Sequence, residues 1–247
     1  MSLAIAPPSR PGKQSGPTRT PAELERLATK AGRELEDAPA AEIVRWAVET
    51  FGDRFCVTSS MQDLTLSHLA STVRPGIDVV FLDTGYHFAE TLGTADAATV
   101  TIPINLVTVR PRQTVAEQDA TLGPELFRRN PDLCCQLRKV APLERALQAY
   151  DAWATGIRRD EAPERANTPV VGWDARRGKV KVAPLARWTQ EDVDRYIEDN
   201  GVLTNPLLYD GYPSIGCWPC TRRVAPGEDP RSGRWAGFAK TECGIHT

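Results

Sequence analysis

The chain has 247 residues, 41% of them hydrophobic, which is enough to bury the core of a single domain. Its 30 basic and 32 acidic residues leave a formal charge of -2, and this balance argues against a protein that coats nucleic acid. Because no apolar run approaches the roughly 18 residues that cross a bilayer and the N-terminus lacks the apolar core of a signal peptide, we expect a cytoplasmic protein that binds neither membrane nor nucleic acid.

The spacing of apolar residues predicts helices and strands in alternation. A flexible tail rich in Pro, Ser and Arg is expected over residues 1–20. Helical spacing then runs from Pro21 to Thr50 and is interrupted at Pro39. The remaining predicted elements are strands at 54–58, 77–82, 104–109, 152–157, 169–173 and 180–182, and helices starting near 64 and 86, over 137–149 and over 189–200.

Strands that alternate with helices predict one α/β domain over residues 21–205, with a mostly parallel sheet and helices on both of its faces. After residue 205 the sequence loses its periodicity and becomes rich in Gly, Pro, Trp and Arg. Residues 206–247 are therefore predicted to form an irregular C-terminal segment, which holds three of the six cysteines.

Two polar turns follow neighbouring predicted strands. Ser59-Ser60-Met61-Gln62-Asp63 leads from one strand into a helix, and Leu82-Asp83-Thr84-Gly85 follows the next strand. Unpaired backbone N–H groups and the helix dipole favour an anion at such turns, although Ser59 or Asp83 can instead serve as a simple helix cap. Ligands of open α/β sheets bind at the carboxyl ends of the strands, so we predict a nucleotide pocket beside Ser59, Ser60 and Asp83.

The cysteine pattern indicates metal or redox chemistry rather than a disulfide framework. Cys134-Cys135 and Cys217-Trp218-Pro219-Cys220 supply four thiolates, the ligand set of a structural zinc or of a [4Fe–4S] cluster. Adjacent cysteine side chains diverge, which suits the larger cluster better than tetrahedral zinc. Cys56 lies in an apolar strand and is predicted to be structural.

The last cysteine, Cys243, stands in Glu242-Cys243-Gly244-Ile245-His246. Nearby Lys240 and His246 would favour a reactive thiolate there. With four other cysteines assigned to a metal, Cys243 becomes a candidate nucleophile, and a surface thiol without a role is the alternative.

From about Phe51 to its C-terminus the sequence resembles the sulfonucleotide reductases, the assimilatory adenylyl sulfate (APS) and phosphoadenylyl sulfate (PAPS) reductases. Each motif is weak alone, but the set, in this order, is highly specific. The motifs are Ser59-Ser60-Met61-Gln62-Asp63, Leu82-Asp83-Thr84-Gly85, Cys134-Cys135-Gln136-Leu137-Arg138-Lys139, Thr155-Gly156-Ile157-Arg158-Arg159, Val182-Ala183-Pro184-Leu185, Gly216-Cys217-Trp218-Pro219-Cys220-Thr221, Gly233-Arg234-Trp235 and Glu242-Cys243-Gly244-Ile245-His246.

The resemblance implies a fold like that of the ATP pyrophosphatases and a two-step mechanism. The Cys243 thiolate would attack the sulfate sulfur, expel AMP and leave an S-sulfonated cysteine, from which reduced thioredoxin would release sulfite. The resemblance also implies one [4Fe–4S] cluster on Cys134, Cys135, Cys217 and Cys220. The residues that it implies at the substrate are Ser59, Ser60, Asp83, Lys139, Gly156, Arg158, Arg165, Arg231, Arg234 and His246.

In this family the four cluster cysteines usually accompany use of APS, whereas members without them use PAPS. The resemblance therefore implies an APS reductase, with PAPS use or dual use as the alternative. Relatives form dimers or tetramers, so a homo-oligomer is expected. The chain departs from the family at Glu161, where relatives often carry Gln after the paired arginines, and this leaves the detail of that loop open.

Three rival interpretations remain on the residues alone. An ATP pyrophosphatase usually carries a glycine-rich S-G-G-x-D-S loop, and the turn at Ser59 lacks both glycines. A zinc-stabilised nucleotide- or RNA-binding module would use the same four cysteines but give a colourless protein. A thioredoxin-like oxidoreductase would surround its C-x-x-C with a pattern that is absent around Cys217.

Overall fold

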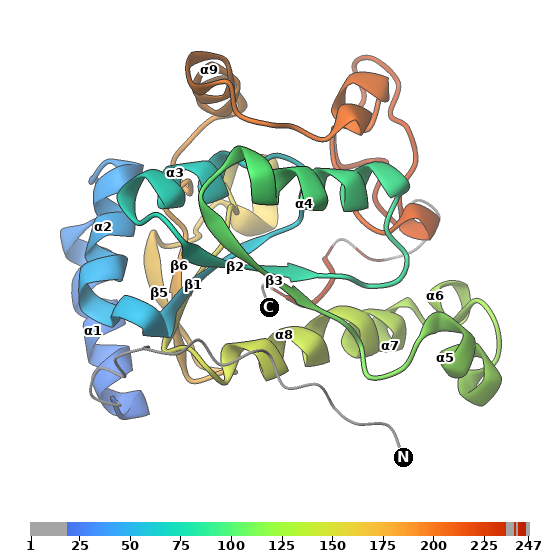
Figure 1. Ribbon diagram of the computed structural model, residues 1–247, viewed down its shortest axis with the longest axis horizontal. Coiled ribbons are helices and arrows are strands. Elements are labelled where there is room, and N and C mark those ends of the chain that lie inside the picture. Colours follow the sequence, from blue (N-terminus) through green and yellow to red (C-terminus); the bar gives the residue numbers. More distant parts are fainter. Residues whose placement is uncertain (1–18, 236–239, 241, 246–247) are drawn as a thin grey trace.

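The computed structural model describes residues 19–235, 240 and 242–245, so most of the predicted N-terminal tail and His246 lie outside the described residues (Figure 1). Thr20 begins α1 (Pro21–Glu34) with a capping box, because its hydroxyl accepts from the Glu23 N–H and the Glu23 carboxylate accepts from the Thr20 N–H. Pro39 stands at the start of α2 (Ala40–Phe51), where a missing N–H costs nothing. The predicted break between two helices is therefore found at Pro39.

Six strands form one sheet in the order β3-β2-β1-β4-β6-β5. All neighbours pair in parallel except β5, which runs antiparallel to β6. The predicted α/β fold with a mostly parallel sheet is thus confirmed. The strands are β1 (Phe55–Ser59), β2 (Ile77–Leu82), β3 (Ile104–Val109), β4 (Ala152–Ala154), β5 (Val171–Asp174) and β6 (Lys179–Val182).

The other helices depart from the prediction mainly between β3 and β4. The single helix predicted over 137–149 is instead a π-helical turn (Gln136–Val140) followed by α8, and the short helix α7 precedes both. Two short helices, α5 and α6, precede them and were not predicted from the sequence. The bounds are α3 (Thr65–Val73), α4 (Ala89–Thr101), α5 (Val115–Leu122), α6 (Leu126–Arg129), α7 (Pro131–Cys135), α8 (Ala141–Leu147) and α9 (Gln190–Asn200).

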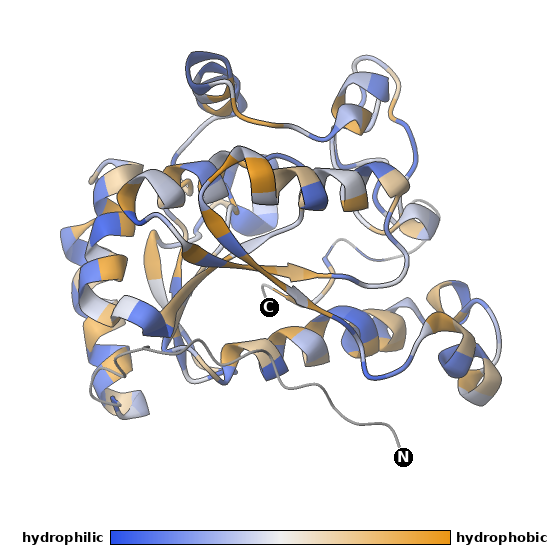
Figure 2. Ribbon diagram, in the orientation of Figure 1, coloured by the Kyte–Doolittle hydropathy of each residue, from blue (hydrophilic) through white to orange (hydrophobic). Residues whose placement is uncertain are grey.

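Alternate residues of each strand supply two hydrophobic layers, as the period of a strand requires. On one face Val57 and Val79 pack under helices α1 to α4, and this is the larger core. On the other face Cys56 and Trp153 pack under α8, together with Ile245 of the C-terminal segment. Figure 1 shows the sheet between these helical layers, and Figure 2 shows its strands as the most hydrophobic part of the chain. Cys56 is fully buried in this second layer, as expected for a structural thiol.

The order of the strands fixes where a ligand can bind. The chain builds outward from β1 through β2 to β3, then crosses back to place β4 on the other side of β1. At such a switch point the loops that leave the carboxyl ends of the two central strands separate and leave a crevice. The loops after β1 and β4 therefore mark the expected site. No helix among the described residues has the length and apolar character that a bilayer span requires.

Candidate active site

The loop after β1 is held in a tight, specific conformation. The Ser59 hydroxyl accepts from the Met61 N–H at 3.1 Å, and Met61 adopts a left-handed φ of 60° with its side chain fully buried. Left-handed non-glycine residues are uncommon and concentrate at functional sites. Gln62 ties this loop to the C-terminal segment, because its side-chain oxygen accepts from the Ile215 N–H at 2.9 Å. The loop after β1 and the segment around Ile215 therefore form two walls of one cavity.

That cavity lies at the switch point and has a volume of about 1380 Å³, its open mouth included. The loops after β1 and β4, the π-helical turn and the C-terminal segment all border it. Of the predicted site residues it brings together Ser59, Ser60, Lys139, Gly156, Arg158, Arg165, Arg231, Arg234 and Cys243.

Asp83 differs from the other predicted residues, because it does not border the cavity. Its carboxylate accepts from the Gly85 N–H at 3.1 Å and pairs with Arg110 at 2.9 Å. These contacts close the turn after β2. Asp83 does not cap α4, whose N-cap is Phe88 without a side-chain hydrogen bond. Thr84 and His87, from the same turn, border the cavity in its place.

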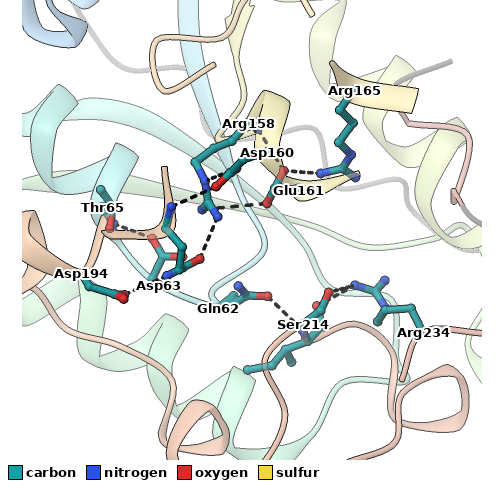
Figure 3. Close-up of polar contacts among 12 residues, drawn as sticks. Gln62, Asp63, Thr65, Arg158, Asp160, Glu161, Arg165, Asp194, Ser214 and Arg234 are labelled. Atoms are coloured by element: carbon teal, nitrogen blue, oxygen red, sulfur yellow. Dashed lines mark hydrogen bonds and ion pairs between the residues drawn. The ribbon is translucent and has the colours of Figure 1, made fainter. Parts of the chain in front are cut away.

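Three of the predicted arginines, Arg158, Arg165 and Arg231, are already engaged by side chains of the protein. Arg158 is bound by Asp160 at 3.0 Å and by the Gln190 side chain at 2.7 Å, at the start of α9 (Figure 3). Arg165, which is 9% exposed, lies between the carboxylates of Glu161 and Glu242. Glu161, the residue at which the sequence departs from the family, thus pairs with Arg165. It also accepts from the Arg158 N–H at 2.9 Å.

Lys139 and Arg234 are different, because within the described residues neither has a carboxylate partner. Arg234 donates to the Ser214 hydroxyl at 3.1 Å (Figure 3) and to the Ile215 carbonyl, while its Nε is buried without a hydrogen bond. Burial lowers the pKa of Arg234. Burial acts in the same direction on Lys139, but the nearby thiols of Cys217 and Cys243 outweigh it and raise the pKa of the lysine. An anion in the cavity would satisfy both cations.

Cys134, Cys135, Cys217 and Cys220 border a second, smaller cavity of about 340 Å³ beside the first. The turn after β2 holds the C-x-x-C loop there, since the Trp218 N–H donates to the Tyr86 carbonyl at 2.8 Å and the Thr84 hydroxyl lies 3.3 Å from the Cys217 sulfur. Aromatic rings of Tyr86 and Phe127 pack against Trp218. The two predicted cysteine pairs, about eighty residues apart in the sequence, are therefore neighbours in the fold.

Burial raises the pKa of Cys134 to about 12 and that of Cys220 to about 11, and in each case the neighbouring thiols add to the effect. In the described part of the chain no three His, Cys, Asp or Glu side chains are grouped as a single metal ion requires. Four thiols around one cavity are the donor set of an iron–sulfur cluster, which is larger than one ion. The donor set thus fits the predicted cluster.

The π-helical turn that follows the double cysteine carries Lys139. A π-helical turn widens the helix and redirects the side chains on it, and such turns occur frequently at functional sites. Arg138 on this turn is buried, donates to the Thr84 carbonyl and, at 3.0 Å, to the Gln118 side chain, and so fixes the turn. Lys139 borders both cavities, as does Trp235, and it therefore lies between the thiols and the larger cavity.

Several residues of the site were not predicted. Glu242 and Asp160 were not predicted. A carboxylate repels an anion and is expected beside an anion site only where it neutralises an arginine, and these pairs cannot be read from the sequence. Glu242 stands next to Cys243 in a motif that was recognised, so its position was the available signal. Gln62 likewise stands in a recognised motif, whereas Ser214 carries no signal of its own and is identified only by its contact with Arg234.

A family model described as phosphoadenosine phosphosulfate reductase domain matches residues 54–223. Curated relatives cover nearly the whole chain. The adenosine 5'-phosphosulfate reductase of Streptomyces coelicolor is 68% identical over 228 residues, which is 92% of this chain and 97% of that protein. The protein of the same name from Mycolicibacterium smegmatis is 58% identical and covers 93% of this chain and 97% of its own length.

Among solved structures, phosphoadenylyl-sulfate reductase from Candida auris, as a phosphate complex, superposes with a TM-score of 0.68 and 28% identity, over 81% of this chain and 97% of that one. FMN adenylyltransferase from Candida glabrata has a TM-score of 0.51 at 13% identity, over 89% of this chain and 74% of its own, and shares only the fold. The resemblance found in the sequence is confirmed. The chain belongs to the phosphoadenosine phosphosulfate reductase family, the sulfonucleotide reductases.

Proposed function

We propose that this protein reduces adenosine 5'-phosphosulfate to sulfite and AMP, with Cys243 as the nucleophile. The names of relatives that are 68% and 58% identical along nearly their full length support this substrate. The single observation that carries the mechanism is the position of Cys243 in the large cavity, together with the cations Lys139 and Arg234, which have no carboxylate partner among the described residues. Residues 206–247 thus act as the active-site segment of the domain formed by residues 21–205.

The residues lining the cavity suggest how the first step proceeds. The Cys243 thiolate attacks the sulfate sulfur, an S–S bond forms, and the S–O bond to the phosphate breaks. AMP departs with the electron pair of that bond. Lys139 and Arg234 offset the charge that develops on the sulfate and the leaving phosphate. Electrostatic stabilisation of this kind is usually the largest single contribution to catalysis. The loop after β1, with Ser59 and Ser60, holds the nucleotide.

The second step needs a dithiol reductant, for which reduced thioredoxin is the proposed partner. One of its thiolates attacks the sulfur of the S-sulfonated Cys243 and releases sulfite with the electron pair. The second thiol of the reductant then attacks the mixed disulfide, which restores the Cys243 thiol and leaves the reductant oxidised. Two electrons pass from the dithiol to the sulfonate group, and the balance requires no other donor.

We further propose that Cys134, Cys135, Cys217 and Cys220 hold one [4Fe–4S] cluster. Four thiols around one cavity support this ligand set, and Lys139 lies between that cavity and the substrate cavity. When bound, the cluster would add an electrostatic influence near the substrate and cross-link two distant parts of the chain. A homo-oligomer, a dimer or tetramer, is part of the same proposal and rests on the family alone.

The function is tested by anoxic turnover with thioredoxin and its reductase, in parallel reactions on APS and on PAPS, with sulfite as the measured product. We expect sulfite from APS, with kcat/KM at least about tenfold above that for PAPS. The additional phosphate of PAPS would have no partner in a site built for APS, and this lowers the rate. Equal rates would establish a dual enzyme, and a preference for PAPS would overturn the substrate assignment. If protein that shows the brown colour of a bound iron–sulfur cluster made no sulfite from either nucleotide, the proposed function itself would be overturned.

A further inference from the structure

The loop after β1 is held from behind by the stretch of chain that follows α9. The Leu64 N–H donates to the Leu203 carbonyl at 3.2 Å, and Asp63 and Thr204 form an isolated antiparallel bridge. The next residue of this stretch, Asn205, is fully buried and does not border the cavity. Asn205 therefore contacts the loop on the side that faces the protein interior.

The amide side chain of Asn205 uses both its nitrogen and its oxygen. Its Nδ2 donates to the Met61 carbonyl at 3.1 Å and to the Thr91 hydroxyl at 3.0 Å, and its Oδ1 accepts from the Leu207 N–H at 3.1 Å. The backbone N–H of Asn205 donates to the Gln62 carbonyl at 2.9 Å. An amide side chain has two N–H donors and one acceptor oxygen, so asparagine matches these partners, whereas an ionised aspartate has no donor for them.

These contacts direct two carbonyl oxygens of the loop away from the cavity. The oxygens of Met61 and Gln62 both accept from Asn205, in a part of the protein that solvent does not reach. Backbone carbonyl oxygens carry partial negative charge, and one that faced the cavity would repel the anionic groups of a nucleotide. Asn205 thus keeps two repulsive groups of the loop on the side opposite the ligand.

The same contacts stabilise the left-handed turn at Met61. A φ of 60° is unfavourable for methionine and persists only where the surrounding contacts determine it. The Ser59 hydroxyl accepts from the Met61 N–H, and Asn205 donates to the Met61 carbonyl, so both sides of the residue are held. The turn buries the Met61 side chain completely, while Ser60 and Gln62 on either side of it border the cavity. A change of conformation at Met61 would therefore move residues of the cavity wall.

We propose that Asn205 is a positioning residue for the nucleotide: its side-chain amide fixes the loop after β1 in the conformation that receives the ligand. This inference rests on the proposed function in one respect, namely that the loop after β1 holds the nucleotide. Because Asn205 lies behind the loop and does not border the cavity, it acts through the loop. Its contribution is to nucleotide binding and not to the chemical step.

Asn205→Asp tests the proposal, because aspartate keeps the shape of the side chain and the oxygen that accepts from Leu207 but loses both Nδ2 donations. Amide hydrogen exchange of the ligand-free protein is followed by mass spectrometry in the peptide that covers residues 59–64. We expect exchange there to be at least about tenfold faster than in the wild type, because loss of a buried hydrogen bond makes local opening easier. The Kd for AMP, measured by calorimetry, should rise by at least about tenfold. In turnover, KM for APS rises while kcat changes by less than about twofold, as expected when binding is lost equally from the ground state and the transition state.

The matched control is Thr91→Val, which removes the other acceptor of the Asn205 amide and leaves the contact with the Met61 carbonyl in place. Thr91 lies in α4 and is as fully buried as Asn205, so this variant also loses a buried hydrogen bond. Its Kd for AMP and its exchange in residues 59–64 should stay within about twofold of the wild type. Asn205→Ser serves if a buried carboxylate prevents folding, because serine keeps an N-cap oxygen for Leu207 without a charge and lacks the amide donors. It is expected to behave like Asn205→Asp.

Wild-type exchange of residues 59–64 together with wild-type affinity for AMP in the Asn205 variants would overturn the proposal. Equal effects in Thr91→Val and Asn205→Asp would also overturn it, because they would assign Asn205 to the general stability of the core. A fall in kcat at unchanged KM would contradict it as well, since the effect would then lie on the chemical step. If the wild type made no sulfite while loop exchange and the Kd for AMP still rose in the Asn205 variants, the proposed function would fail and the role of Asn205 would stand. The two failures are therefore distinguishable.

Discussion

At the scale of single residues, the cavity separates cations that serve the protein from cations available to a ligand. Arg158 and Arg165 are directed at carboxylates, whereas Lys139 and Arg234 are not. The sequence motifs identified all four as candidates without distinguishing them. Whether an arginine is available depends on which carboxylates fold next to it, and those contacts span up to 77 positions in the chain.

His87 gives a prediction about pH. Its Nε2 lies 2.8 Å from the Leu82 carbonyl oxygen, and burial lowers its pKa in the folded protein. Below the unfolded value of about 6.5 the unfolded chain therefore binds more protons than the folded chain, and stability falls as the pH decreases. We expect the urea midpoint to drop between about pH 7.5 and about pH 5.5.

In His87→Gln the pH dependence should be smaller over the same interval, because the variant has no proton to take up at this position. His68, whose pKa is also lowered by burial, contributes in the same direction and remains in the variant. An identical pH dependence in the wild type and in His87→Gln would show that His87 does not contribute.

At the scale of elements, the sequence predicted regular segments well and the irregular ones poorly. The strands 77–82 and 104–109 and the helix after Thr189 have the predicted bounds, because each combines a clear period with a cap or a turn. Helix α5 was missed although Thr114 and Glu117 form a capping box before it. The π-helical turn after the double cysteine has no sequence period of its own, and only packing around Arg138 reveals it.

The C-x-x-C loop and the segment that carries Arg234 pair with each other, and Gly216 leaves room for the Arg234 side chain. Thr221 and Arg234 form an isolated antiparallel bridge. A Cβ on Gly216 would lie 2.5 Å from the Arg234 guanidinium, so a side chain there must displace the arginine. Gly216→Ala is therefore expected to lower kcat/KM for APS by about tenfold or more, as loss of one charge-stabilising donor does.

Gly93 provides the matched control for that substitution. It lies within α4, and a Cβ there meets no atom within 4 Å. Gly93→Ala should retain full kcat/KM and gain about 0.5–1 kcal/mol of stability, because alanine restricts the unfolded chain and favours the helix. Full activity in Gly216→Ala would mean that Arg234 is not needed where it lies.

At the scale of the whole molecule, the two ends of the sheet have separate roles. The carboxyl ends of β1 and β4 build the cavity, and the opposite ends are closed by polar contacts in the interior. There Asp151, whose side chain is 3% exposed, binds Arg54 in a bidentate pair at 2.5 and 2.7 Å. The parallel order of the strands followed from their alternation with helices, whereas the antiparallel β5 was not predicted. The connection between β5 and β6 is too short for a parallel crossover, and its length was the signal of direction.

This separation predicts that stability and substrate use can be changed independently. Asp151→Asn leaves Arg54 without its buried counter-charge and should cost about 2–3 kcal/mol of unfolding free energy, while KM for APS stays unchanged. Asp37→Asn is the control, because Asp37 is 89% exposed in its pair with Arg187 and should cost less than about 0.5 kcal/mol. A changed KM in Asp151→Asn would show that the far end of the sheet shapes the cavity.

Cys243 is tested as the nucleophile by the intact mass of the protein after anoxic incubation with APS in the absence of a reductant. We expect the gain of one sulfonate group, located on the Cys243 peptide and removed by reduced thioredoxin. Cys243→Ser should gain none and should keep the brown colour expected from the proposed iron–sulfur cluster. A sulfonate on another cysteine, or loss of colour in Cys243→Ser, would contradict the assignment of Cys243 as the free nucleophile.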